Sequence, residues 1–133
     1  MTSLSSVLPA TNSAVKALGQ NFSAAGVAPL TATINDTAAH ILGPYAPQLA
    51  RDIWLTLNAT VAATGVAQLL RSNDGGVTKI GVTSQGAVKA SYQFNAAAGV
   101  IVNEAIHTES DATATFYLSI QLSAGTVTVR LAQ

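Results

Sequence analysis

The sequence predicts an all-β fold: an antiparallel β-sandwich of roughly eight or nine strands with an N-terminal arm. Between residues 51 and 133, short β-branched and apolar runs alternate with Gly, Asn and Ser turns. Their spacing of roughly 8 to 12 residues is typical of sandwiches and small barrels. All connections are short, which favours antiparallel pairing because parallel strands need a long crossover.

Residues 1–30 differ in composition from the rest of the chain. They are rich in Ser, Ala and Asn, are interrupted by Pro and Gly, and carry one charge, Lys16. Val15, Leu18 and Phe22 would line one face of a helix of about three turns, which is marginal alone. Two interpretations stay open, a flexible leader and an arm that orders against a neighbouring subunit. In the second, the docking side chains are Leu4, Val7, Leu8, Val15, Leu18 and Phe22.

The sandwich domain is expected over residues 31–133. Its first two strands are predicted at 31–35 and 38–42, joined by a tight Asn-Asp connection. Pro44 and Pro47 then block both helix and sheet pairing. We expect the segment around them to cross rigidly between sheets.

The run 51–58 is the next predicted strand. It places Ile53, Leu55 and Leu57 on the core face and Trp54 on the opposite face. The single tryptophan therefore covers a second layer or is offered to a partner. We expect Trp54 at a partner interface.

Six further strands are predicted from alternating or apolar runs. The last two, 113–122 and 126–131, are expected to form a hairpin joined at Ser123-Ala124-Gly125. The other four are 65–71, 78–83, 88–94 and 100–106. Strands of this number and length indicate an immunoglobulin-like or jelly-roll-like sandwich. The expected inward side chains are Ile34, Ile41, Ile53, Leu55, Leu57, Val66, Leu70, Val82, Val88, Tyr92, Phe94, Ile101, Phe116, Leu118, Ile120, Val127, Val129 and Leu131.

One turn resembles the Asp-box, Ser-x-Asp-x-Gly-x-Thr-Trp. Lys79 stands where the aromatic normally lies, and the four matching residues are Ser72, Asp74, Gly76 and Thr78. The resemblance implies a structural turn, in which the carboxylate caps backbone N–H groups and glycine takes a positive φ. In sialidase-like propellers the box repeats, so a single copy in 133 residues excludes a propeller.

The composition disfavours several classes of protein. Only 9% of residues are charged and the formal net charge is zero, against roughly 25% charged residues in an ordinary domain. Such a chain has little to repel its neighbours, which favours a subunit of an assembly. Lys and Arg are scattered singly, which disfavours nucleic-acid binding. There is no cysteine, and no apolar stretch approaches the roughly 18 residues of a membrane-spanning helix.

The few chemically capable side chains form no recognisable active site. Glu104, Glu109 and Asp111 are the one local acidic cluster, and a solvated loop is favoured because regular calcium-ligand spacing is missing. His107 with Glu104 is the nearest candidate metal pair, and no spacing brings His40 beside them. Nucleophile elbows and phosphate-cradling loops are absent from the sequence. We therefore expect no enzyme activity, no cofactor and no metal.

Several segments together carry a family resemblance. They are RDIWLTLN, LLRSNDGG, the Asn103-Glu104 segment and the ending TFYLSIQLSAGTVTVRLAQ. Over residues 52–133 the chain thereby resembles small β-sandwich structural proteins of tailed bacteriophages. That group usually closes with a Gly-Thr-Val turn followed by Arg-Leu-Ala/Ser-Gln, which residues 125–133 match. The Ala-rich loop 60–64 and Lys79 depart from the pattern.

The resemblance implies a virion structural protein, in the first place a capsid decoration or head-associated protein. It would be synthesised in the host cytoplasm and carried in the virion. Its partners would be the major capsid protein or other virion subunits and copies of itself, as in a trimer, with no nucleic acid and no membrane. The alternative is a tail or fibre-tip module that binds a host surface ligand or carbohydrate through Trp54, Tyr45 and Tyr117. A small hydrolase ranks last, because no base, nucleophile and orienting group can be named.

Overall fold

The structure, a computed structural model, describes residues 27–133. Within that range it is all-β with antiparallel pairing, which confirms the predicted fold class. The six arm residues from Leu4 to Phe22, and the short helix expected there, lie outside the described range. Two long strands dominate, β3 (Asp52–Ser72) and β9 (Thr115–Ala132). The others are β1 (Leu30–Ile34), β2 (His40–Tyr45), β4 (Ile80–Gly81), β5 (Thr83–Ser84), β6 (Ala87–Val88), β7 (Ser91–Ala96) and β8 (Gly99–Thr108).

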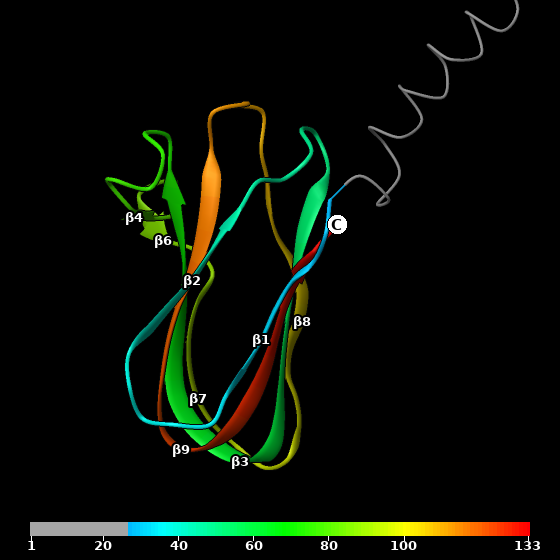
Figure 1. Cartoon of the computed structure of the whole chain (residues 1–133), viewed down its shortest axis with the longest axis vertical. Coiled ribbons are helices and arrows are strands. Elements are labelled where there is room, and N and C mark those ends of the chain that lie inside the picture. The colour runs from blue at the N-terminus through cyan, green and yellow to red at the C-terminus, as the bar shows by residue number, and fades with distance from the viewer. Residues whose placement is uncertain (1–26) are drawn as a thin grey trace, which may run out of the picture.

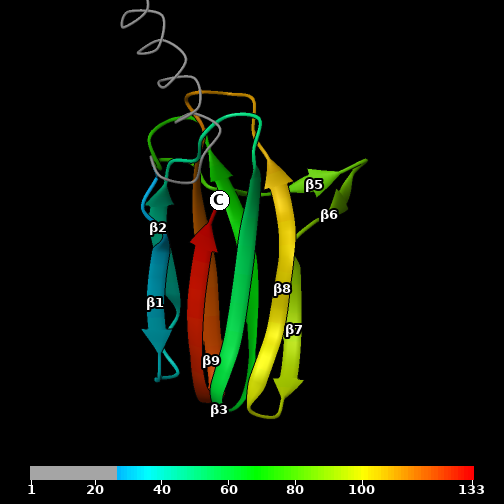
Figure 2. The same ribbon diagram turned by 90° about the vertical axis from the view of Figure 1, so that its right-hand side faces the viewer.

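The two long strands run through both layers of the sandwich, so one sheet is folded once on itself (Figure 1). The first half of β3 pairs with β8 and its second half with β7. In the same way, the second half of β9 pairs with β1 and its first half with β2. Layer A therefore has the order β1-β9-β3-β8, seen side by side in Figure 2, and layer B the order β2-β9-β3-β7.

Small residues form the line along which the sheet folds. We call this end of the sandwich the closed end, where β3 crosses between the layers over residues 59–65 and β9 over 122–126. Gly125 has a φ of 87°, and a Cβ there would clash with the carbonyl oxygen of Ala62. The two long strands therefore approach one another at a position that only glycine tolerates.

The predicted hairpin between 113–122 and 126–131 is wrong. The two segments belong to one strand, β9, and each pairs with β3 instead of with the other. Likewise, the predicted strands 51–58 and 65–71 are the two halves of β3. A few small residues between two apolar runs occur both in a hairpin turn and in a strand that bends. Which of the two forms depends on whether the runs pair with each other or with another strand, here β3.

The connections between strands change layer at both ends. β1 and β2 lie in opposite layers and do not pair, so the tight turn expected at Asn35-Asp36 is wrong and residues 35–39 cross the closed end. Residues 46–51 lead from β2 in layer B to β3 in layer A. The crossover expected around Pro44 and Pro47 begins later than predicted, because β2 continues through Pro44 to Tyr45, which pairs with Phe116. We call this second end the open end. It carries the links 46–51, 73–79 and 109–114 (Figure 1).

The core lies between the two layers, and most of the predicted inward side chains are in it. Val66 is an error: it is 47% exposed, and Ala67 and Leu69 are buried instead. A continuous strand keeps its alternation through the fold, so the inner face of Leu55 and Leu57 continues at Ala67 and Leu69. Ile41 and Val88 are exposed as well. The remaining departures are half-buried: Leu70, Tyr92 and Ile101.

Candidate functional site

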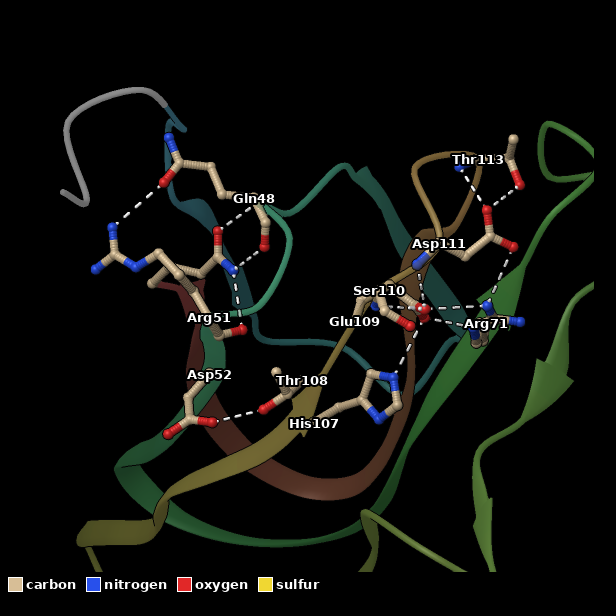
Figure 3. A network of polar contacts seen from close by, with 11 residues as sticks. Gln48, Arg51, Asp52, Arg71, His107, Thr108, Glu109, Ser110, Asp111 and Thr113 are labelled. Atoms are coloured by element: carbon tan, nitrogen blue, oxygen red, sulfur yellow. Dashed lines mark hydrogen bonds and ion pairs between the residues drawn. The ribbon is translucent and has the colours of Figure 1, made fainter. Parts of the chain in front are cut away.

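The densest polar cluster lies at the open end, between the end of β3 and the end of β8 (Figure 3). Glu109, one residue after β8, is only 4% exposed. Arg71 donates to its carboxylate through Nε, 2.5 Å from Oε1, and through Nη2, 3.1 Å from Oε2. The backbone N–H groups of Ser110 and Asp111 donate to Oε2 at 3.0 Å each, and His107 Nε2 lies 3.2 Å from Oε1. A buried carboxylate is thus surrounded by donors.

These contacts fix the charges of the cluster. Above all, the hydrogen bond from Arg71 lowers the pKa of Glu109 to about 2, against the opposing effect of burial. The same bond raises the pKa of Arg71. Arg71 Nη2 also lies 3.5 Å from Asp111 Oδ2, and hydrogen bonds from Thr113 lower the pKa of Asp111. Arg71, Glu109 and Asp111 are therefore all ionised near neutral pH.

The cluster also holds the connecting segments of the open end. The backbone N–H of Ala50, in the link 46–51, donates to the carbonyl oxygen of Glu109 at 2.8 Å. The ring of His107 packs on that of Phe116, with centroids 5.2 Å apart. Each Glu109 oxygen accepts hydrogen bonds from its own chain. We call the cluster of Arg71, His107, Glu109 and Asp111 the clasp, because it joins the end of β3 in layer B to the end of β8 in layer A.

One expectation about these residues is wrong: Glu109 is not solvated but buried, and it accepts hydrogen bonds from Arg71 and from two backbone N–H groups. His107 and Glu104 do not pair: Glu104 accepts the phenol O–H of Tyr92 at 2.6 Å, and His107 contacts Glu109. Burial and the contact with Glu104 raise the pKa of Tyr92. Local spacing carries no signal of the clasp, because Arg71 and Glu109 are 38 positions apart.

All six carboxylates of the sequence lie in the described part of the chain, and each accepts a hydrogen bond within it. Among residues 27–133 no group of three or more His, Asp or Glu is placed to hold a metal ion. The acceptor and donor pairs are Asp36 with Ala38, Asp52 with Thr108, Asp74 with Thr78, Glu104 with Tyr92, Glu109 with Arg71, and Asp111 with Thr113.

The turn that follows β3 joins Ser72, the last residue of that strand, to Asp74, Gly76 and Thr78. Asp74 accepts the Thr78 N–H at 2.9 and 3.1 Å and the Ser72 hydroxyl at 2.7 Å. The Ser72 oxygen in turn accepts the Gly76 N–H at 2.9 Å. The bond from the Thr78 N–H is the main cause that lowers the pKa of Asp74 to about 2. The carboxylate and the serine hydroxyl thus hold the turn together from within.

The residue after the turn fastens it to layer B. Lys79 donates to the Gly76 carbonyl at 2.6 Å and lies 4.8 Å above the ring of Tyr117. The turn and Lys79 therefore cover Tyr117, which is buried. Tyr45 is buried in the core cluster. Of the three aromatic residues expected at the surface, Trp54 alone is exposed, by 44%.

Two of the shallow hollows lie on the outer faces of the two layers. The larger, about 520 Å³, crosses β3, β7 and β9 of layer B and is lined by Thr64, Gly65, Val66, Gln93, Phe94, Asn95, Gln121, Leu122 and Ser123. The smaller, about 400 Å³, lies on layer A and is lined by Thr31, Ala32, Thr33, Thr56, Thr128, Val129 and Arg130. Arg130 is the single charged side chain in the two linings.

Comparison of the chain with protein-family models, with curated proteins and with solved structures finds no match. Across residues 27–133, no helix has both the length and the apolar character to cross a membrane. What the chain does must therefore be inferred from its own contacts and surfaces.

Proposed function

We propose that this protein is a bacteriophage virion structural protein, a capsid decoration or head-associated subunit that stabilises the shell by protein–protein packing. The observation that carries the proposal is where the charges lie. All six carboxylates accept hydrogen bonds inside the chain, whereas the outer faces of both layers present mainly short or uncharged polar side chains. Faces with few charges and no net charge suit permanent packing among many copies.

The partners in this proposal are the major capsid protein or other virion subunits, and further copies of the chain. The apolar arm residues Leu4, Val7, Leu8, Val15, Leu18 and Phe22 would dock on a neighbouring subunit. Such a tether raises the effective concentration of the second contact without requiring a larger core.

The tail or fibre-tip module has less support. A sugar-binding platform relies on exposed aromatic rings, and Tyr45 and Tyr117 are buried. Trp54 alone is a narrow platform for stacking. The structural role in a shell is therefore the better supported of the two.

The test is co-sedimentation of the full-length protein with empty capsids of the phage that encodes it. We expect the protein to pellet with the capsids and to saturate at a fixed ratio to the capsid subunits. A protein that stays in the supernatant at every ratio would contradict the proposal. A matched variant lacking residues 2–26 should lose attachment and keep its far-ultraviolet circular dichroism, and full attachment of that variant would refute the arm assignment.

A further inference from the structure

The outer face of layer A presents its one large aromatic side chain between two small ones. Trp54 on β3 lies opposite Ala132 on β9 and Ala105 on β8. With methyl groups on both neighbouring strands, the indole stays 44% exposed. Burying the rest of such a ring is worth roughly 1 to 2 kcal/mol, so a partner that covers it gains that stabilisation.

Two charged side chains accompany Trp54 on this face. Arg130 is exposed on β9 and makes no ion pair with any residue of 27–133. Asp52 is exposed on β3; it accepts the Thr108 hydroxyl at 2.6 Å and, in the same range, has no cationic partner. One cation and one anion are thus both left without an opposite charge.

The strand register places these charges on opposite sides of Trp54. Asp52 precedes Trp54 by two positions on β3, whereas Arg130 pairs with Thr56, two positions after it. At about 3.4 Å per residue, each charge lies roughly 7 Å from Trp54 along the strand direction. Arg130 is offset sideways by one strand spacing, about 4.8 Å, a distance that an arginine side chain spans.

We propose that the outer face of layer A is a contact between two copies of this chain, related by a two-fold axis. The axis passes beside Trp54, parallel to the face and perpendicular to the strands. It reverses the strand direction, so Arg130 of each copy meets Asp52 of the other while the two indoles pack at the centre. The face is therefore complementary to itself, with two ion pairs around an aromatic anchor.

The residue types fit such a contact. Tryptophan and arginine are the side chains that most often dominate the energy of protein interfaces. Uncharged short side chains surround them on layer A: Thr31, Thr33, Thr56, Asn58, Asn103 and Thr128. This face would be the interface of the homo-oligomer in the proposed function. Its role in a virion rests on that function.

The size of the face sets the expected strength. Four strands about 4.8 Å apart, each contributing about five residues, cover roughly 19 by 17 Å. That is less than the roughly 800 Å² per partner of a standard interface. We therefore expect a concentration-dependent dimer with a dissociation constant on the order of micromolar.

The test uses two charge reversals in the full-length chain, Arg130→Asp and Asp52→Arg, measured by sedimentation velocity over a concentration series. Either variant alone sets like charges against each other at both pairs, and we expect its dimerisation to weaken at least about tenfold. Mixed in equal amounts, the two variants bring opposite charges together at both pairs. We expect the mixture to recover a heterodimer, which a purely structural defect within either chain cannot produce.

Lys89→Asp is the matched control, because Lys89 lies between β6 and β7 and not on a strand of layer A. This variant should dimerise like the wild type. Trp54 is the only tryptophan, so its emission should shift to shorter wavelength with concentration in the wild type and in the mixture. A wild type that stays monomeric, oligomers that neither reversal weakens, or a mixture that stays monomeric would each overturn the proposal. No capsid enters these measurements, so this inference and capsid attachment fail separately.

Discussion

Arg71 and Glu109 join the two layers of the folded sheet at the open end, through hydrogen bonds of 2.5 Å and 3.1 Å. Arg71 lies near the end of β3 in layer B, and Glu109 follows β8 in layer A. The long strands β3 and β9 carry the backbone pairing from one layer to the other only at the closed end. The side-chain pair therefore closes the end that the backbone ladder leaves open.

Removing the charge of Glu109 should destabilise the fold. Glu109→Gln removes the nearest counter-charge of the Arg71 guanidinium and leaves only Asp111, 3.5 Å away, and we expect a loss of about 3 kcal/mol in the free energy of unfolding. Urea denaturation followed by circular dichroism measures it. Asp36→Asn is the control, since Asp36 is exposed and its pair with His40 is screened by water. Adding Arg71→Met to Glu109→Gln should recover part of the loss, and a double variant no more stable than the single one would point to packing instead of charge.

Acid should open the same clasp over a defined range. The pKa of Glu109 is lowered from 4.5 to about 2, so the unfolded chain takes up its proton first as the pH falls. The stability due to this carboxylate is present above about pH 4.5 and is lost as the pH falls toward 2. The free energy of unfolding of the wild type should decline more steeply there than that of Glu109→Gln. Asp74 titrates alike in both proteins, so parallel curves would show that Glu109 contributes nothing.

The bend of β9 should depend on the absence of a side chain at Gly125. Gly125→Ala combines an unfavourable positive φ with a clash against Ala62, and we expect it to cost about 3 kcal/mol or more. Gly86→Ala is the matched control: its φ is 83°, and a Cβ there meets nothing within 4 Å. It should cost about 1 kcal/mol, the conformational part alone. Equal midpoints of urea unfolding for the two variants would mean that the bend relaxes around the new methyl group.

Much of the fold could be predicted because alternation is a local property of the sequence. The inward faces of Ile53 to Leu57 and of Phe116 to Leu122 follow from period two alone. Whether a strand continues past a break of small residues is decided by its partner. If 51–58 and 65–71 are two separate strands, the inward side of the second cannot be derived from the inward side of the first. The larger side chain, Val66, is then predicted in the core in place of Ala67.

The same distinction separates the two polar clusters. The Asp-box pattern can be recognised because its four residues stand within 72–78. Glu109 looks no different from Glu104 in the sequence, since each lies near apolar residues in the same segment. Only the meeting of two strand ends makes the first a buried partner of Arg71 and the second an exposed partner of Tyr92.

The turn after β3 should lose its protection when Asp74 is removed. The Asp74 carboxylate accepts the Thr78 N–H at 2.9 Å and the Ser72 hydroxyl at 2.7 Å. In Asp74→Ala the Thr78 N–H can hydrogen-bond only to water, and we expect its amide hydrogen exchange to become about tenfold faster. Asn73→Ala, one residue away and exposed, should leave the exchange of Thr78 unchanged. The amides of Leu55 and Leu57 in the core should exchange alike in both variants, because the turn lies outside the ladder of β3 and β9. Unchanged protection of Thr78 in Asp74→Ala would mean that the backbone and Lys79, which donates to Gly76, hold the turn without the carboxylate.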